Sequence, residues 1–178
     1  YVQGLNFVAA FALSELEGDE ELAFALVVRL LHSPRLKLRG LYTRGLPYVR
    51  VATLVLESLV REQLPHVADH FARVGIDCVL LFELYFTLFT IALPTQLCRA
   101  VWDEVLEGGW PALFSTVIAL LAHLSDSGLL LGRDFHGSVM ALKAYNNSRL
   151  AVVYGEAVPS SSAASAVASA AASAATAA

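Results

Sequence analysis

The sequence predicts an all-α fold, and the spacing of its apolar residues is the first observation behind this prediction. These residues recur at three- and four-residue steps along most of the chain up to Lys143, as on one face of a helix. Prolines and glycines stand where such stripes begin and end. Strand signals are poor, because no alternating run is bounded by Asn-Gly or Asp-Gly turns. We expect about seven or eight helices.

The first two expected helices flank an acidic turn, Glu17-Gly18-Asp19-Glu20. Asp19 is the expected N-cap of the second helix, because a carboxylate accepts hydrogen bonds from free backbone N–H groups. Ser33-Pro34 should end that helix, since Pro disfavours helical geometry in the residue before it. The basic segment from Arg35 to Arg44 is expected to be a loop.

The next two helices are expected to begin at Pro47 and Pro65, where a missing N–H costs nothing. Gly75 should stop the shorter of them. The longer one has an apolar stripe that we expect to face inward: Val49, Ala52, Val55, Leu56, Leu59 and Val60.

The second half of the chain predicts four more helical segments. Val79 to Thr90 is apolar almost all round, as expected of a helix surrounded by neighbours. Pro94 begins another helix, which Gly108-Gly109 ends, and the stripe from Trp110 to Leu124 predicts the next. Asp134 is expected to cap a last helix that runs through Lys143.

Composition excludes several classes of protein. Apolar residues make up 57% of the chain and charged residues 16%, which excludes a charge-rich disordered protein. The net charge of -4 leaves no basic stripe, so no nucleic-acid partner is expected. Cys78 and Cys98 lack metal-type spacing, and two buried thiols are favoured over one disulfide. His66 and His70 have the spacing of helical zinc ligands, but no third ligand follows at a credible distance, so no metal site is expected.

The most apolar segment, Cys78 to Leu93, raises the question of membrane insertion. A spanning helix needs about 20 mostly apolar residues. This segment is shorter, contains Glu83, and is followed by Pro94. We therefore interpret it as part of a buried core, with insertion as the alternative.

The first six residues, Tyr1-Val2-Gln3-Gly4-Leu5-Asn6, place a polar amide on flexible backbone just before an amphipathic helix. Gly allows the backbone to approach a ligand closely, and a helix N-terminus favours anions. An amide in this place can position a water molecule or a phosphate oxygen. On the chemistry of these residues alone, an ordinary capping loop is the favoured interpretation.

These six residues resemble the Tyr-x-Gln-Gly-Met-Asn motif of TBC-domain Rab GTPase-activating proteins, with Leu5 in place of the usual Met. Tyr85 stands where the family usually has Trp, and Ala100 where it often has Arg. Further pieces resemble the same family in the same order up to Ala144: Leu41-Tyr42, Gly45-Leu46-Pro47, Leu64-Pro65, His70-Phe71, Gly75-Ile76, Phe86-Thr87-Leu88-Phe89, Leu93-Pro94, Val101-Trp102-Asp103, Glu107-Gly108, Asp134-Phe135 and Leu142-Lys143.

The resemblance implies a two-finger mechanism of GTPase activation. Gln3 would align the attacking water, while Tyr1, Gly4 and Asn6 would support its loop and bind the GTPase. The implied partner is a Rab-type small GTPase in its GTP form. GTP and Mg²⁺ would belong to that partner, and this chain would hold no cofactor of its own.

The family's second finger is an arginine in an Ile-x-x-Asp-x-x-Arg motif, which this sequence lacks. The chain opens without Met, and its only Met is Met140. We therefore expect an N-terminally truncated TBC-type domain whose arginine finger lies upstream of Tyr1. Alone it is expected to be a poor catalyst, because losing an arginine finger forfeits a factor of ~10³ or more.

Two alternatives remain open at this stage: a non-catalytic Rab-binding or scaffolding TBC protein in membrane traffic, and an unrelated helical bundle. Residues 1–150 are assigned to the helical domain. Residues 151–178 contain mostly Ala and Ser and are expected to be disordered. The expected location is cytoplasmic, with at most peripheral association with endomembranes.

Overall fold

The computed structural model describes residues 2–144, and all regular secondary structure within that range is helical. The all-α prediction is confirmed. The α-helices are α1 (Leu5–Glu15), α2 (Glu20–His32), α3 (Pro47–Gln63), α4 (Pro65–Val74), α5 (Phe82–Phe86), α6 (Thr95–Gly108), α7 (Trp110–Asp126) and α8 (Phe135–Ala144). Two short 3-10 helices accompany them: η1 (Leu38–Leu41) and η2 (Cys78–Leu81).

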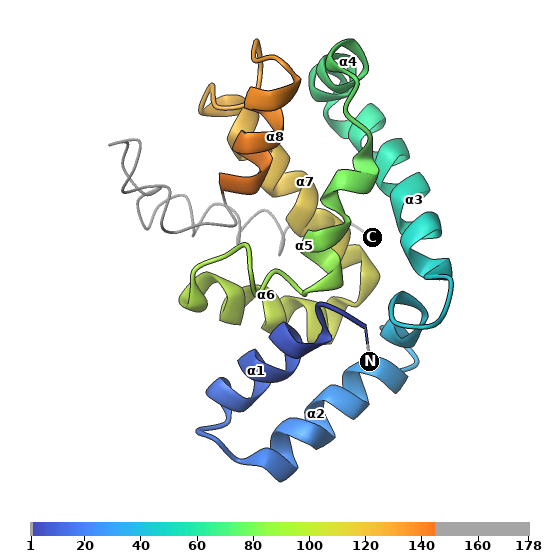
Figure 1. Cartoon of the computed structure of the whole chain (residues 1–178), viewed down its shortest axis with the longest axis vertical. Coiled ribbons are helices and arrows are strands. Elements are labelled where there is room, and N and C mark those ends of the chain that lie inside the picture. The colour runs from blue at the N-terminus through green and yellow to red at the C-terminus, as the bar shows by residue number, and fades with distance from the viewer. Residues whose placement is uncertain (1, 145–178) are drawn as a thin grey trace.

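The helices surround α7, which contacts α3, α5 and α6 (Figure 1). Helices α1 and α2 pack together at one end of the molecule, and α3 continues into α4 along one side. The N-terminal loop lies near the centre of this view, where α1 begins and α5 ends (Figure 1). Segments far apart in the sequence therefore meet around the motif that contains Gln3.

The helix ends follow the predicted local signals. The Asp19 Oδ1 atom accepts a hydrogen bond from the Leu22 N–H at 2.9 Å and caps α2. Helices α3 and α4 begin at Pro47 and Pro65, and Gly75 ends α4 with a φ of 77°. Asp134 accepts from the Gly137 N–H at 2.8 Å at the start of α8. These predictions are confirmed, because each depends on contacts within a few residues.

The prediction of one helix from Val79 to Thr90 is wrong. The segment forms η2 and the five-residue α5, and then turns back at Leu88 and Phe89. Both residues are buried and both are left-handed, with φ values of 48° and 62°. This conformation strains non-glycine residues, so surrounding contacts must hold it. The Trp102 indole supplies one contact by donating to the Leu88 carbonyl at 2.9 Å.

The core is a continuous cluster of buried apolar side chains contributed by all the helices around α7. Most of the predicted stripe on α3 is buried or half-buried, but Val55 is 39% exposed and was wrongly placed inside. Trp102 and Tyr85 are buried, as expected of packing aromatics. Cys78 and Cys98 are free buried thiols, and burial raises the pKa of each to about 12.

Within residues 2–144, no helix is both long enough and apolar enough to span a membrane. The segment considered for insertion, Cys78 to Leu93, instead contains the short α5 and the left-handed turn. Tyr1 and residues 145–178 lie outside the described part of the chain, so the predictions for them and for the domain boundary at residue 150 stay untested.

Candidate functional site

The candidate site is built around the backbone of Gly4, the residue that precedes α1. Gly4 is buried and has a φ of 112°, a conformation that L side chains rarely adopt. A Cβ atom placed there would lie only 2.5 Å from Cε1 of the Phe86 ring. Two independent constraints therefore require glycine here: the backbone conformation and the aromatic ring against which the loop packs.

The loop is also held by its own hydrogen bonds. The Gly4 N–H donates to Oδ1 of Asn6 at 3.1 Å. The Leu5 N–H donates to the Val2 carbonyl at 3.2 Å, and the Phe7 N–H to the Gly4 carbonyl at 3.1 Å. The Asn6 side chain therefore accepts a hydrogen bond within the turn.

Gln3 lies at the exposed apex of this turn. Within residues 2–144, its amide takes part in no hydrogen bond. A neutral amide carries both a donor and an acceptor. Its backbone is held by the Gly4 turn while its side chain is open to solvent. This arrangement can present both hydrogen-bonding groups to a molecule bound from outside.

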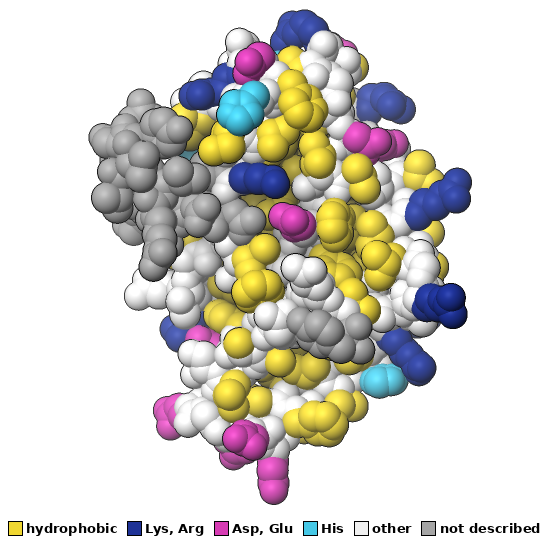
Figure 2. Space-filling model, viewed as in Figure 1, with side chains coloured by type: hydrophobic (Ala, Val, Ile, Leu, Met, Phe, Trp, Pro, Cys, Tyr) yellow, Lys and Arg dark blue, Asp and Glu magenta, His cyan; other side chains and the backbone are white. Residues whose placement is uncertain are grey.

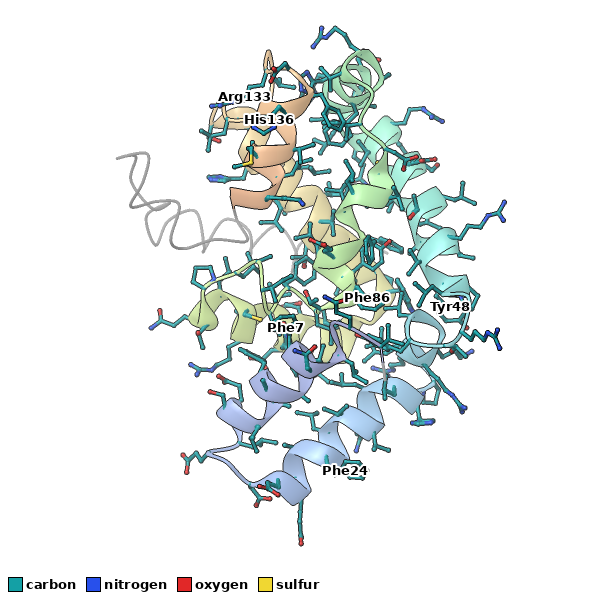
Figure 3. All side chains as sticks on the ribbon, in the orientation of Figure 1. Phe7, Phe24, Tyr48, Phe86, Arg133 and His136 are labelled. Carbon is teal, nitrogen blue, oxygen red and sulfur yellow. The ribbon has the colours of Figure 1, made fainter. Side chains whose placement is uncertain are left out.

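Gly4 packs against the ring of Phe86, which is labelled in Figure 3, and this ring in turn contacts other aromatic rings. The Phe86 ring at the end of α5 lies 4.9 Å from the Tyr42 ring, centroid to centroid, and 5.6 Å from the Phe82 ring. The Tyr42 hydroxyl donates to the Phe86 carbonyl at 2.5 Å. Burial raises the pKa of Tyr42, so this hydroxyl stays protonated and remains a donor.

Of the four residues predicted for the site, Gln3, Gly4 and Asn6 lie together in one turn, and Tyr1 lies outside the described residues. Sequence reasoning placed Tyr42 and Phe86 only in the pattern of resemblance and assigned them no role in the site. The two residues are 44 positions apart in sequence. No local spacing signals that their side chains meet.

The two histidines with zinc-type spacing have other partners. His66 Nε2 lies 2.9 Å from the Ser125 hydroxyl on α7, and His70 Nε2 lies 2.9 Å from the Ser138 hydroxyl on α8. His70 is 1% exposed. Among residues 2–144, no group of three or more His, Cys, Asp or Glu side chains could hold a metal ion.

The face that carries the N-terminal loop is mostly apolar at its centre (Figure 2). Lys and Arg side chains lie along the edge formed by α3 and the segment before it, and acidic side chains gather at the turn between α1 and α2 (Figure 2). Phe7 is 43% exposed one helical turn after Gln3, and Phe24 on the neighbouring α2 is 72% exposed. Phe7 lies near the constrained polar turn, whereas Phe24 lies toward the other end of α2 (Figure 3). A large exposed aromatic beside a polar turn is typical of a protein-binding surface.

This geometry agrees with the family comparison. The family model of the Rab-GTPase-TBC domain matches residues 1–130, which include the Gln3 turn, Tyr42 and Phe86. The chain belongs to the Rab-GTPase-TBC domain family. In this TBC domain the matched region extends from the N-terminal loop through α7.

Curated relatives of the TBC domain include two proteins of Caenorhabditis elegans. Rab GTPase-activating protein eat-17 is 34% identical over 122 residues, which are 68% of this chain and 13% of that protein. Rab GTPase-activating protein tbc-11 is 31% identical over 140 residues, or 78% of this chain and 14% of that protein. The chain therefore spans about a seventh of the length of these relatives.

A solved structure has the same fold. The Chlamydomonas flagellar RabGAP TBC domain superposes with a TM-score of 0.74 at 23% identity, covering 96% of this chain and 52% of that one. At this level of identity the likeness concerns the fold alone. It supports the all-α fold that the sequence predicted.

Proposed function

We propose that this TBC domain stimulates GTP hydrolysis by a Rab-type small GTPase in its GTP form, and that Gln3 positions the hydrolytic water. The observation that carries the proposal is the exposed amide of Gln3 on a turn whose backbone is fixed by Gly4. GTP and Mg²⁺ belong to the partner, and the domain contributes side chains rather than a cofactor.

The chemistry of phosphoryl transfer suits such a contribution. Catalysis of GTP hydrolysis depends on alignment of the water and on stabilisation of the charge that develops on the γ-phosphate. The Gln3 amide can accept a hydrogen bond from the water and donate one to a phosphate oxygen, and it stays neutral throughout. Because the turn is already folded, little conformational entropy is lost when the partner binds.

An arginine is the second part of the proposed mechanism. A planar guanidinium can bond two phosphate oxygens and neutralise their charge. Since the Ile-x-x-Asp-x-x-Arg motif is absent from this sequence, the proposal assigns the arginine to a segment outside it. The chain tested alone is then expected to be a weak activator, with a loss of ~10³ or more relative to a domain that has both fingers.

The apolar surface beside Gln3 supports a protein partner. Phe7 presents a large exposed ring on α1 close to the turn, and docking of a GTPase would cover it. The proposed working location is the cytoplasmic face of endomembranes, reached through the partner rather than through insertion of this domain.

The test is GTP hydrolysis by a panel of GTP-loaded Rab proteins, measured with the complete natural protein that carries this sequence. We expect Gln3→Ala to lower the stimulated rate by ~10²-fold, as removal of a transition-state hydrogen bond does in other enzymes. Gln63→Ala is the matched control, because Gln63 is an exposed amide at the end of α3. It should leave the rate unchanged.

The possible results separate the proposal from the scaffolding alternative. Binding of GTP-loaded Rab without faster hydrolysis would indicate a scaffold. Stimulation that is equal in wild type and Gln3→Ala would show that water alignment comes from elsewhere.

A further inference from the structure

The support beneath the Gln3 turn is not local to the motif. Gly4 is pressed against the Phe86 ring so closely that a methyl group at Gly4 would overlap both Cε1 at 2.5 Å and Cδ1 at 2.7 Å. Phe86 is 4% exposed. The Phe86 ring therefore limits how closely the turn can approach the core. We call this ring the aromatic wall.

The wall itself is anchored on its Tyr42 side. The Tyr42 hydroxyl donates to the Phe86 carbonyl, and the two rings pack at 4.9 Å. This contact joins the segment after η1 to the last residue of α5. A hydrogen bond from a half-buried hydroxyl to a backbone carbonyl fixes the backbone as well as the ring.

The wall is anchored on its other side by the left-handed turn that follows. The Leu88 carbonyl accepts from the Trp102 indole at 2.9 Å and lies 3.7 Å from the Cys98 sulfur. Thr87 donates through its hydroxyl to the Glu83 carbonyl at 2.7 Å. Contacts thus hold the backbone on both sides of Phe86, and its ring has little freedom to move away from Gly4.

We propose that Phe86 and Tyr42 are positioning residues that set the position and orientation of the Gln3 side chain. Neither side chain touches the GTPase in this mechanism. Each acts through Gly4, whose neighbour in the chain is Gln3. The inference rests on the proposed function and assigns it two residues from outside the N-terminal motif.

The first test replaces the wall with a smaller apolar side chain. Phe86→Leu removes the aromatic edge beneath Gly4 and lets the turn sink. In the GTP hydrolysis assay we expect kcat to fall by ~10- to 100-fold, because a displacement of about 1 Å is enough for such a loss. The KM for Rab is expected to stay within about twofold, since the exposed surface of α1 and α2 is unaltered.

The second test removes one hydroxyl group. Tyr42→Phe keeps the ring and deletes the donor to the Phe86 carbonyl, and kcat is expected to fall by ~3- to 10-fold. Tyr48→Phe is the matched control. Tyr48 is also half-buried, and its hydroxyl takes part in no hydrogen bond within residues 2–144. This variant should keep the wild-type kcat.

The decisive measurement is a double-mutant cycle with Gln3→Ala. If Phe86 acts through Gln3, Phe86→Leu costs nothing further once the amide is gone, and the double variant equals Gln3→Ala alone. A general loss of folding would lower activity again in the double variant. The same result for Tyr42→Phe in the Gln3→Ala background would support the inference even if Phe86→Leu folds poorly.

The outcomes distinguish this inference from the function on which it rests. If Gln3→Ala has no effect, the proposed function fails, and this inference fails with it. If Gln3→Ala abolishes stimulation while Phe86→Leu and Tyr42→Phe behave as wild type, only the positioning role is overturned. A Phe86→Leu loss that persists in full without Gln3 also overturns it.

Discussion

Two regions of the molecule are held together in different ways. Around Gly4 the backbone is irregular: Gly4, Leu88 and Phe89 all have positive φ values, and the Phe86 ring packs against both Gly4 and the Tyr42 ring. In the region formed by α4, α7 and α8, regular helices are joined by hydrogen bonds from His66 to Ser125 and from His70 to Ser138. Other residues with positive φ values lie elsewhere, among them Gly75 after α4 and Gly128 after α7, but at Leu88 and Phe89 two consecutive buried non-glycine residues adopt this conformation.

The difference has a physical cause. A regular helix satisfies its own backbone groups, so neighbouring helices need only pack and pair a few side chains. A left-handed Leu or Phe is unfavourable by about 1–3 kcal/mol and persists only when surrounding contacts impose it. Here the Trp102 indole and the buried Phe89 ring impose it. The region around Gly4 therefore depends on contacts between distant segments, whereas the helices α4, α7 and α8 satisfy most of their own backbone groups.

The largest expected effect comes from adding a methyl group at Gly4. Gly4→Ala should lower Rab-stimulated GTP hydrolysis by ~10²-fold, because the new Cβ must displace either the Phe86 ring or the Gln3 turn. Gly18→Ala is the matched control. Gly18 has a similar φ of 86°, but nothing lies within 4 Å of its Cβ position. Equal losses of activity in both variants would mean that backbone strain, not the ring, is responsible.

The next effect concerns the bond that holds the left-handed turn. Trp102→Phe leaves the buried Leu88 carbonyl without its indole donor and should lower the free energy of unfolding by ~1–3 kcal/mol, measured by urea denaturation. Trp110→Phe also deletes an indole donor, to the Leu36 carbonyl. Because Trp110 is only partly buried, water can replace that bond, and the loss should be smaller. The opposite ranking would contradict the account of the turn.

The region formed by α4, α7 and α8 should make the stability of the domain depend on pH. Burial, together with the nearby Arg73 guanidinium, lowers the pKa of His70, so the folded state binds its proton less readily than the unfolded state. The contribution to stability is complete above the unfolded pKa of about 6.5 and declines as the pH falls from there toward the lower folded pKa. We expect the urea midpoint to fall over this window.

The control for this prediction is a pair of substitutions. His70→Gln should remove part of the decline below pH 6.5, whereas His136→Gln, at an exposed position on α8, should leave the slope unchanged (Figure 3). A wild-type slope in His70→Gln would show that other groups cause the decline.

The smallest expected effect lies at a helix end away from both regions. Asp19→Ala removes the cap of α2 and should reduce the free energy of unfolding by ~1 kcal/mol. Asp69→Ala, at an exposed position within α4, should be neutral or slightly stabilising, because Ala has the higher helix propensity. A loss at Asp69 as large as that at Asp19 would mean that charge, not capping, is measured.

Much of the fold could be predicted from local sequence patterns. The helix starts at Pro47 and Pro65, the cap at Asp19 and the stop at Gly75 were all predicted correctly. Hydrophobic spacing also identified most of the inward face of α3. Val55 was placed wrongly, because periodicity shows which residues share a face but not how much of that face a neighbour covers.

The candidate site could be predicted only in part from the sequence. The place of Gln3, Gly4 and Asn6 in one turn followed from their adjacency, and the resemblance to the TBC family gave the turn its proposed meaning. The aromatic wall was not foreseen. Phe86 was expected inside a long helix, and an apolar run predicts burial without revealing that its chain reverses direction.

The sequence by itself determined where most helices begin and end, because caps, prolines and glycines act on backbone groups a few residues away. Tertiary structure alone decided that Leu88 and Phe89 turn left-handed and that Tyr42 contacts the Phe86 ring on which Gly4 packs. Those features arise from contacts between distant segments. Their energies exceed the local preference for helix, and no pattern within a short window records them.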